Sequence, residues 1–483
     1  MDRRTSSRVL VFALGALASF GCSASEVARE VEKAPPPSGP SPSGDEETPR
    51  EESPPDGTGC AQRAAAFATV KAAFAKQLAQ KNIPGGSIAV LCEGSRIFSA
   101  GVGSTARSGG APVKETTRFQ IASITKMLTA IVAMRLSERG SVDLGGSVAP
   151  AVPFVNTKAP YARDFTWSEL LSHTSGYPTS LGSGELDLES RYRQVGSTKL
   201  WAPPGAVFNY SNEGYAIAGL ALQRKAGKPF AALVKEHVFD PAGMTGASMD
   251  AAAVQKAGDY AKGHAEGTEV VEPTDGYLAS TYYGPMGGAW ASARDMASLA
   301  RALLKDDGTL LRKETRDAMT KPHTKTTWGA RQYGLGVIVD QLEGGDVVWS
   351  HDGSVGGYLG SFVLYPKQRL ALAVLVNSDA DFPSMEDVTY EAFTGKKIPA
   401  PAAPLETVDE AECAGSYTSL SLGNVTIAAS GGGLTFNGKR MTKLYGSTYE
   451  FDAADGYPDT ATFWRADGKV KYLVAGTGVA SKN

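Results

Sequence analysis

The sequence predicts an α/β fold, with an antiparallel sheet flanked by helices, an inserted helical lobe and a small all-β domain at the C-terminal end. Strand patterns occur early, as SIAVLCEG and SRIFSAGVG, and return late, as YGLGVIVD, DVVWSHDG, LGSFVLYP and LALAVLVN. Helical patterns such as YAIAGLALQRKAG and ARDMASLARALLKDDG fill the middle, from about residue 166 to residue 320. Closely spaced consecutive strands favour antiparallel pairing, so the early and late strands are expected to form one sheet.

The sequence pattern changes after Pro404 to short strands separated by turns. Five short strand patterns follow (NVTIAAS, GLTFNGKR, STYEFDA, TATFWRADG and KVKYLVAG), separated by turn dipeptides such as Asn437-Gly438. Such spacing is typical of a small meander or barrel. We therefore expect one domain over residues 60–397 and a small all-β domain over residues 405–483.

The bulk composition allows a large core and excludes some functions. The chain has 483 residues, of which 42% are apolar, and its formal net charge is −3. A protein that binds nucleic acid usually carries a basic surface, and this composition offers none. We expect no nucleic-acid partner.

The first 22 residues have the features of an export signal. Three arginines precede an apolar run over residues 9–20, which is too short to span a bilayer. The run leads to Cys22, and the segment resembles a bacterial lipoprotein signal in which this cysteine is lipidated and becomes the mature N-terminus. Ser19 departs from the leucine usual in such signals and leaves ordinary signal-peptidase cleavage open. The resemblance implies a periplasmic or cell-surface lipoprotein that is anchored to the membrane through its N-terminal lipid.

Residues 23–59 contain many prolines, serines, glycines and acidic residues, including PPPSGPSPSG. A segment of this composition has too few apolar side chains to form a core, so we interpret it as a linker.

The cysteines and histidines do not predict a metal site. Cys60 opens an Ala-rich helical stretch and Cys92 closes the strand after it, so the two are either a disulfide or a pair of buried thiols. Cys413 has no evident partner. The five histidines are scattered and the four cysteines lack ligand spacing, so we expect no metal and no other cofactor.

The segment FQIASITKMLTAIVAMRL places Ser123 and Lys126 at the head of an otherwise apolar helix. Positions i and i+3 share a helix face, and a helix that is apolar all round is buried. Burial lowers the pKa of a lysine, which makes its amine a plausible base for a serine hydroxyl. One Ser-x-x-Lys is expected by chance in a chain of this length, so the pair alone is a weak signal.

Two further segments strengthen it: FNYSNEGYAIAG contains Tyr210 and Asn212, and VVWSHDGSVGGYLGSFVLYP contains the triplet that begins at His351. The three motifs resemble, in order and spacing, those of the serine β-lactamases and penicillin-binding peptidases, most of all the branch that contains class C β-lactamases, DD-peptidases, D-aminopeptidases and esterases. The resemblance covers about residues 61–394 and includes connecting segments such as LLSHTSGYP and GPMGGAW. It implies the β-lactamase/transpeptidase-like fold.

The resemblance also implies roles. Ser123 is the expected nucleophile that forms an acyl-enzyme, and Lys126 and Tyr210 are expected to share the general base and acid work. The backbone N–H groups of Ser123 and Ser354 are expected to form the oxyanion hole.

The remaining site residues are expected to contact the substrate. Asn212 would position the acyl side chain or the lysine, or it would only cap the helix that follows. His351 would face the cleft and offer a hydrogen bond or a charge where relatives carry lysine, and Gly353 ends the same triplet. His173, in LLSHTSG, is interpreted as structural.

Asp352 departs from the family pattern, which has threonine or serine in the middle of the triplet. If its side chain reaches the cleft, the anion should repel substrates that carry a carboxylate and favour neutral esters, amides or amines. If it points into the sheet or pairs with a cation, this expectation falls away.

Taken together, the sequence predicts an exported serine hydrolase that acts through an acyl-enzyme on an ester, amide or β-lactam bond of a small molecule or peptide. The alternative is a non-catalytic ligand-sensing or scaffold protein that retains the fold. The presence of Ser123, Lys126 and Tyr210 together favours the enzyme.

Overall fold

The computed structural model describes residues 60–182, 184, 186–265, 269–379, 382–402, 406–429, 433–452, 458–476 and 478–483. The predicted signal, Cys22 and the linker lie outside the described residues. Among the residues that are described, no helix is both long enough and apolar enough to cross a membrane.

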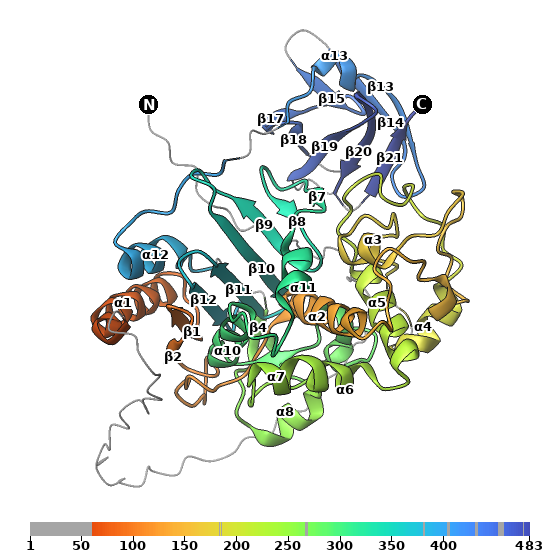
Figure 1. The fold of residues 1–483 in the computed structure, drawn as a ribbon. Coiled ribbons are helices and arrows are strands. Elements are labelled where there is room, and N and C mark those ends of the chain that lie inside the picture. Colours follow the sequence, from red (N-terminus) through yellow and green to blue (C-terminus); the bar gives the residue numbers. More distant parts are fainter. Residues whose placement is uncertain are drawn as a thin grey trace, which may run out of the picture. The chain divides into compact units, whose positions relative to one another are not determined.

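An eight-stranded sheet forms the centre of the larger domain, in the order β2-β1-β12-β11-β10-β9-β8-β7 (Figure 1). Every neighbouring pair is antiparallel, as the sequence predicted. The early strands join the late ones because β1 pairs along its length with β12. The strands are β1 (Gly85–Cys92), β2 (Arg96–Gly103), β7 (Thr324–Lys325), β8 (Gln332–Tyr333), β9 (Ile338–Gln341), β10 (Val347–Val355), β11 (Tyr358–Tyr365) and β12 (Leu370–Val376).

Helices cover both faces of this sheet, and side chains that alternate along each strand face them in turn. On one face, α1 (Ala64–Gln80) and α12 (Glu386–Thr394) pack against residues such as Ile88 and Val374. On the other face, α2 (Thr125–Glu138) and α10 (Ala293–Leu303) pack against residues such as Ala373. Strands β1, β11 and β12 are buried along their whole length because both of their faces are covered.

The middle of the chain forms the helical lobe and its connections. Its helices are α3 (Trp167–Leu171), α4 (Leu188–Val195), α5 (Asn212–Ala226), α6 (Phe230–Val234), α7 (Asp240–Ala242), α8 (Ala251–Ala257), α9 (Gly284–Gly287) and α11 (Lys313–Thr320). Short turns are η1 (Cys60–Arg63), η2 (Ala122–Ile124), η3 (Ala149–Ala151), η4 (Lys235–Phe239) and η5 (Gly276–Ala279). Two small sheets pair β3 (Phe119–Gln120) with β6 (Trp290–Ala291) and β4 (Gly263–Ala265) with β5 (Glu269–Val271).

The C-terminal region is all-β, apart from the single turn α13 (Glu410–Cys413), and its strands form one nearly closed, barrel-like sheet (Figure 1). Its interior is filled by side chains that include Tyr417, Tyr449 and Phe463, so these aromatic residues form core. The strands are β13 (Gly415–Ser419), β14 (Gly423–Ala429), β15 (Leu434–Phe436), β16 (Lys439–Arg440), β17 (Thr442–Tyr445), β18 (Thr448–Asp452), β19 (Pro458–Ala466), β20 (Lys469–Ala475) and β21 (Gly478–Lys482).

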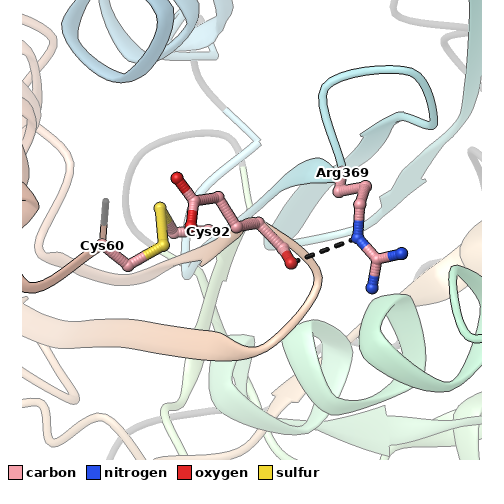
Figure 2. Close-up of a disulfide and its surroundings, with 4 residues drawn as sticks. Cys60, Cys92 and Arg369 are labelled. Atoms are coloured by element: carbon pink, nitrogen blue, oxygen red, sulfur yellow. Dashed lines mark hydrogen bonds between the residues drawn. A yellow bond between two sulfur atoms is a disulfide. The ribbon is translucent and has the colours of Figure 1, made fainter. Parts of the chain in front are cut away.

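Of the two arrangements left open for Cys60 and Cys92, the structure has the disulfide (Figure 2). It joins the turn before α1 to the end of β1, with the two Cα atoms 6.1 Å apart. Beside it, the Arg369 Nε donates a hydrogen bond to the Glu93 carbonyl oxygen at 3.2 Å. Cys413 is buried and free. The disulfide therefore fixes the N-terminal end of the described domain to the central sheet.

Candidate active site

Ser123 lies in a strained turn. The sequence predicted that it would occupy the first turn of an α-helix, but it lies in the 3₁₀ turn η2, and α2 begins only at Thr125. Ala122, just before it, has a φ of 46°, a region that few residues other than glycine adopt. Side chains at i and i+3 eclipse one another in a 3₁₀ turn, so the turn still brings Ser123 and Lys126 together.

Lys126 is completely buried and is held at two points. Its Nζ lies 3.0 Å from the Ser123 Oγ and donates a hydrogen bond to the Met286 carbonyl oxygen at 2.9 Å. Thr129, one turn further on, donates from Oγ1 to the Pro285 carbonyl oxygen at 2.6 Å. The segment GPMGG is therefore held along α2 by Lys126 and Thr129, and Thr125 accepts the N–H of Ala289 just after it.

The electrostatics of this position favour the neutral amine. Burial lowers the pKa of Lys126 well below its ordinary value, because an ammonium loses its hydration there. A neutral amine has a lone pair and can accept the proton of a serine hydroxyl at this distance. The geometry and the lowered pKa of Lys126 are those that the predicted general base requires.

Tyr210 completes the group of three. Its phenol takes part in a side-chain hydrogen bond with Ser123, and its ring centroid lies 4.8 Å from the Lys126 Nζ. Burial raises the pKa of Tyr210 above its ordinary value, although the hydrogen bond with Ser123 opposes this in part. The phenol is therefore protonated near neutral pH, and its role as an acid stays a prediction.

Asn212 is not the cap of the helix after Tyr210. Ser211 is the N-cap of α5, and its Oγ accepts the Gly214 N–H at 2.8 Å and donates to the Pro178 carbonyl oxygen at 2.5 Å. Asn212 is the first helical residue, with a half-buried side chain, and its backbone N–H donates to the Thr179 carbonyl oxygen. The capping alternative for Asn212 is thus wrong, and its role toward the substrate stays a prediction.

Strand β10 touches the turn that carries the nucleophile. A Cβ atom on Gly353 would lie 2.2 Å from the Ile121 carbonyl oxygen, so only glycine allows this approach. Strand β9 pairs with β10 only from Val347 to Ser350, which leaves residues 351–355 with no strand on that side in the described part of the chain. Ser354, which is half-buried, follows Gly353 on β10. The oxyanion role of Ser123 and Ser354 stays a prediction.

His351 does not supply the charge that the sequence suggested. Its Nδ1 donates to the Asp352 carbonyl oxygen at 2.7 Å, so its Nε2 accepts from the Tyr333 hydroxyl at 3.0 Å. Burial, with the nearby Lys126, lowers the pKa of His351 to about 3. The imidazole is therefore neutral near pH 7, and both of its nitrogens already have partners within the protein.

Asp352 is paired, so the expectation that it repels carboxylate substrates is not supported. Strand alternation points its side chain to the opposite face from His351, where its Oδ1 accepts from the Ser361 Oγ at 2.8 Å. Its Oδ2 lies 3.8 Å from the Arg331 Nη1. The repulsion required an anion without a partner, and Arg331 compensates this one.

Two residues outside the predicted catalytic set lie close to it. Tyr333 donates a hydrogen bond to His351, and the ring centroid of His173 lies 4.3 Å from that of Tyr210. The segment LLSHTSG was the available signal for His173, which we expected to be structural. Nothing local in the sequence indicates Tyr333, because β8 and β10 are separate segments that both pair with β9.

No metal site is evident in the described residues. The one group of side chains there with suitable ligand spacing is Cys60, Cys92 and Glu93, and its two sulfur atoms are joined in the disulfide. A disulfide has no thiolate to offer a metal.

A serine beside a buried amine and a half-buried phenol is an arrangement that suits a serine hydrolase. Residues 70–395 match the family described as Beta-lactamase, about two thirds of the chain, and the chain belongs to that family. The protein is a serine hydrolase with the β-lactamase/transpeptidase-like fold.

Known relatives and a solved structure agree with this assignment. Penicillin-binding protein 4 of Amycolatopsis lactamdurans is 27% identical over 360 residues, which are 70% of this chain and 94% of that protein. Esterase EstB of Burkholderia gladioli is 29% identical over 196 residues, which are 37% of this chain and 50% of the esterase. The crystal structure of SurE superposes with a TM-score of 0.69 at 24% identity and covers 88% of this chain and 99% of its own.

Proposed function

We propose that this hydrolase acts through an acyl-enzyme formed on Ser123, with Lys126 as general base and Tyr210 as general acid. The observation that carries the proposal is the 3.0 Å approach of a completely buried Lys126 Nζ to the Ser123 Oγ. A buried amine has the lowered pKa that a base for serine needs near neutral pH.

Acylation begins when the Ser123 oxygen attacks the substrate carbonyl carbon and Lys126 takes the hydroxyl proton. As the carbon–leaving-group bond breaks, Tyr210 gives its phenolic proton to the leaving oxygen or nitrogen, and the proton on Lys126 restores the phenol. Water then attacks the acyl carbon and releases the acid, while the serine regains its proton. Positioned proton transfer of this kind contributes about 10²–10⁴ in rate.

The oxyanion that forms in both steps would be bound by the backbone N–H groups of Ser123 and Ser354. Their segments touch where Gly353 meets Ile121, which supports this assignment. Asn212, at the start of α5, would contact the acyl side chain.

The substrate is a small molecule or peptide with an ester, amide or β-lactam carbonyl. The named relatives include a penicillin-binding protein and an esterase, which supports carbonyl chemistry without favouring one leaving group. Because Asp352 is paired with Arg331, a substrate carboxylate is not disfavoured by it.

Export, and anchoring to the bacterial membrane through a lipid on Cys22, also belong to the proposal. The apolar run before Cys22 and the linker after it support them, and the disulfide is consistent with an oxidising compartment. Fractionation of cells that express the full chain tests this part. The wild type should sediment with membranes, and Cys22→Ala should not.

The reaction is tested with a panel of p-nitrophenyl butyrate, D-alanine p-nitroanilide and nitrocefin, using residues 60–483 and the Ser123→Ala variant. The proposal expects at least one substrate to be turned over by the wild type and not by Ser123→Ala. Equal turnover by both proteins would contradict it, and no turnover by a folded wild type would favour the ligand-sensing alternative.

A further inference from the structure

We infer that His173 is a positioning residue that holds Tyr210 against Ser123 and Lys126. The inference rests on the proposed role of Tyr210. His173 contacts Tyr210 and the two residues that flank it, so its effect would pass through Tyr210.

The backbone of His173 is held in an unfavourable conformation. It follows the C-cap of α3 with a φ of 61°, a left-handed conformation that suits glycine or asparagine. For a larger residue this conformation is strained. Glycine would end the helix without that strain, so the reason for a histidine must lie in its side chain.

His173 forms hydrogen bonds to the chain on both sides of Tyr210. Its carbonyl oxygen accepts the Asn209 N–H at 2.8 Å, and its Nδ1 accepts the Ser211 N–H at 2.9 Å. These two donors flank Tyr210 directly. One residue therefore fixes the backbone before and after the catalytic phenol.

The imidazole also packs against the tyrosine ring itself. The two ring centroids are 4.3 Å apart, with an angle of 33° between the ring planes. The same imidazole contacts the rings of Tyr215 and Tyr333, each at 4.9 Å. The Tyr210 ring therefore rests on a side chain that is itself enclosed by aromatic residues, which restricts its rotation.

The hydrogen bond to Ser211 sets the protonation of the imidazole. Because Nδ1 accepts an N–H, the ring proton is on Nε2, and Nε2 is buried without a hydrogen-bond partner in the described structure. An unpaired buried donor destabilises the folded state, because it loses its hydrogen bond to water. A phenylalanine would avoid that loss but could not accept the Ser211 N–H, so the acceptor at Nδ1 is the property that distinguishes histidine here.

The experiment compares three variants of residues 60–483. His173→Phe keeps a ring and removes the acceptor, and His173→Asn restores an acceptor near the Nδ1 position and tolerates left-handed backbone. His237→Phe is the matched control, because His237 is also buried but lies on η4, away from the three catalytic side chains. The readouts are kcat and KM on p-nitrophenyl butyrate, the labelling rate with a fluorophosphonate, and the unfolding midpoint.

We expect His173→Phe to lose about 10- to 100-fold in kcat, with KM changed less than about threefold. The reason is that the substitution would misorient the Tyr210 phenol and leave substrate binding largely intact. His173→Asn should recover most of the loss. The inference is overturned if His173→Phe keeps its kcat, if His173→Asn is as slow as His173→Phe, or if His237→Phe slows equally at a similar unfolding midpoint.

Two further variants keep the test decisive. If His173→Phe does not fold, His173→Gly takes its place, since glycine suits the backbone and supplies no acceptor; the same comparison with His173→Asn then applies. Tyr210→Phe is measured in parallel. If Tyr210→Phe keeps the kcat of the wild type, the proposed function is contradicted. If Tyr210→Phe has a lowered kcat while His173→Phe keeps that of the wild type, only the inference about His173 is contradicted.

Discussion

The Lys126 Nζ lies 3.0 Å from the Ser123 Oγ at a position where no part of the lysine side chain meets solvent. An ammonium in such a place is costly, whereas a neutral amine that donates to the Met286 carbonyl oxygen is tolerated. Burial of this lysine therefore lowers the stability of the folded state and, at the same time, favours the neutral amine that the proposed base requires.

Replacing this amine should separate activity from stability. Burial lowers the pKa of Lys126 well below its ordinary value, so the unfolded chain binds this proton more tightly than the folded chain does. The residue therefore lowers the free energy of unfolding, and that free energy rises with pH up to the ordinary lysine pKa. Lys126→Met should lose about 10²–10⁴ in kcat/KM and be at least as stable as the wild type at pH 7. Chemical denaturation and ester hydrolysis measure the two effects. A variant that is both inactive and several kcal/mol less stable would indicate a structural amine.

His351 should make the fold sensitive to acid. Its pKa is lowered to about 3 in the folded protein, against about 6.5 in the unfolded chain. Stability from this group is complete above pH 6.5 and is lost as the pH falls toward 3, with a slope of up to about 1.4 kcal/mol per pH unit. Denaturation curves from pH 4 to pH 7 should show a steeper fall for the wild type than for His351→Gln. Identical slopes would show that His351 charges as easily in the folded state as in the unfolded one.

The contact between Gly353 and Ile121 should not tolerate a methyl group. Gly353→Ala would place a Cβ 2.2 Å from the Ile121 carbonyl oxygen and displace the turn before Ser123. We expect a loss of about 1–3 kcal/mol in stability and at least a tenfold loss in the rate of fluorophosphonate labelling. Gly356→Ala is the control, because Gly356 is exposed and a Cβ there meets no atom within 4 Å. Equal labelling rates in the two variants would mean that the close approach does not shape the nucleophile's turn.

The disulfide should stabilise the domain without taking part in catalysis. Cys60 and Cys92 are 32 residues apart, and closing a loop of that length stabilises the folded state by about 3–4 kcal/mol in the chain-entropy model. The double variant Cys60→Ser, Cys92→Ser should unfold correspondingly earlier in denaturant and hydrolyse esters at the wild-type rate at 25 °C. A reductant should lower the denaturant concentration at which the wild type unfolds and leave that of the double variant unchanged. A loss of activity in a folded double variant would contradict the purely structural role.

Local patterns predicted the antiparallel sheet and its early and late strands, because periodicity and turn residues are encoded within a few positions. Strands β13, β17 and β21 were not predicted. The last of these reads GVASK, a short and weakly apolar segment that becomes a strand because β13 and β20 pair with it on either side. Pairing between distant segments leaves little trace in local composition.

The same limit applies to the site. The spacing of Ser123 and Lys126 predicted their contact, and the structure has this contact although the turn is 3₁₀ and not α-helical. The low pKa of His351 follows from its burial, and the partners of His351 and Asp352, Tyr333 and Arg331, come from a separate segment of the chain. Such partners follow from tertiary packing, so the sequence alone did not reveal them.

The most direct test of the central claim is the intact mass of residues 60–483 after treatment with a fluorophosphonate probe, measured beside Ser123→Ala. We predict a single adduct on the wild type, located on Ser123 by peptide mapping, and none on the variant. A folded wild type that takes up no probe, or a Ser123→Ala variant that is labelled as fast as the wild type, would contradict an activated nucleophile at Ser123.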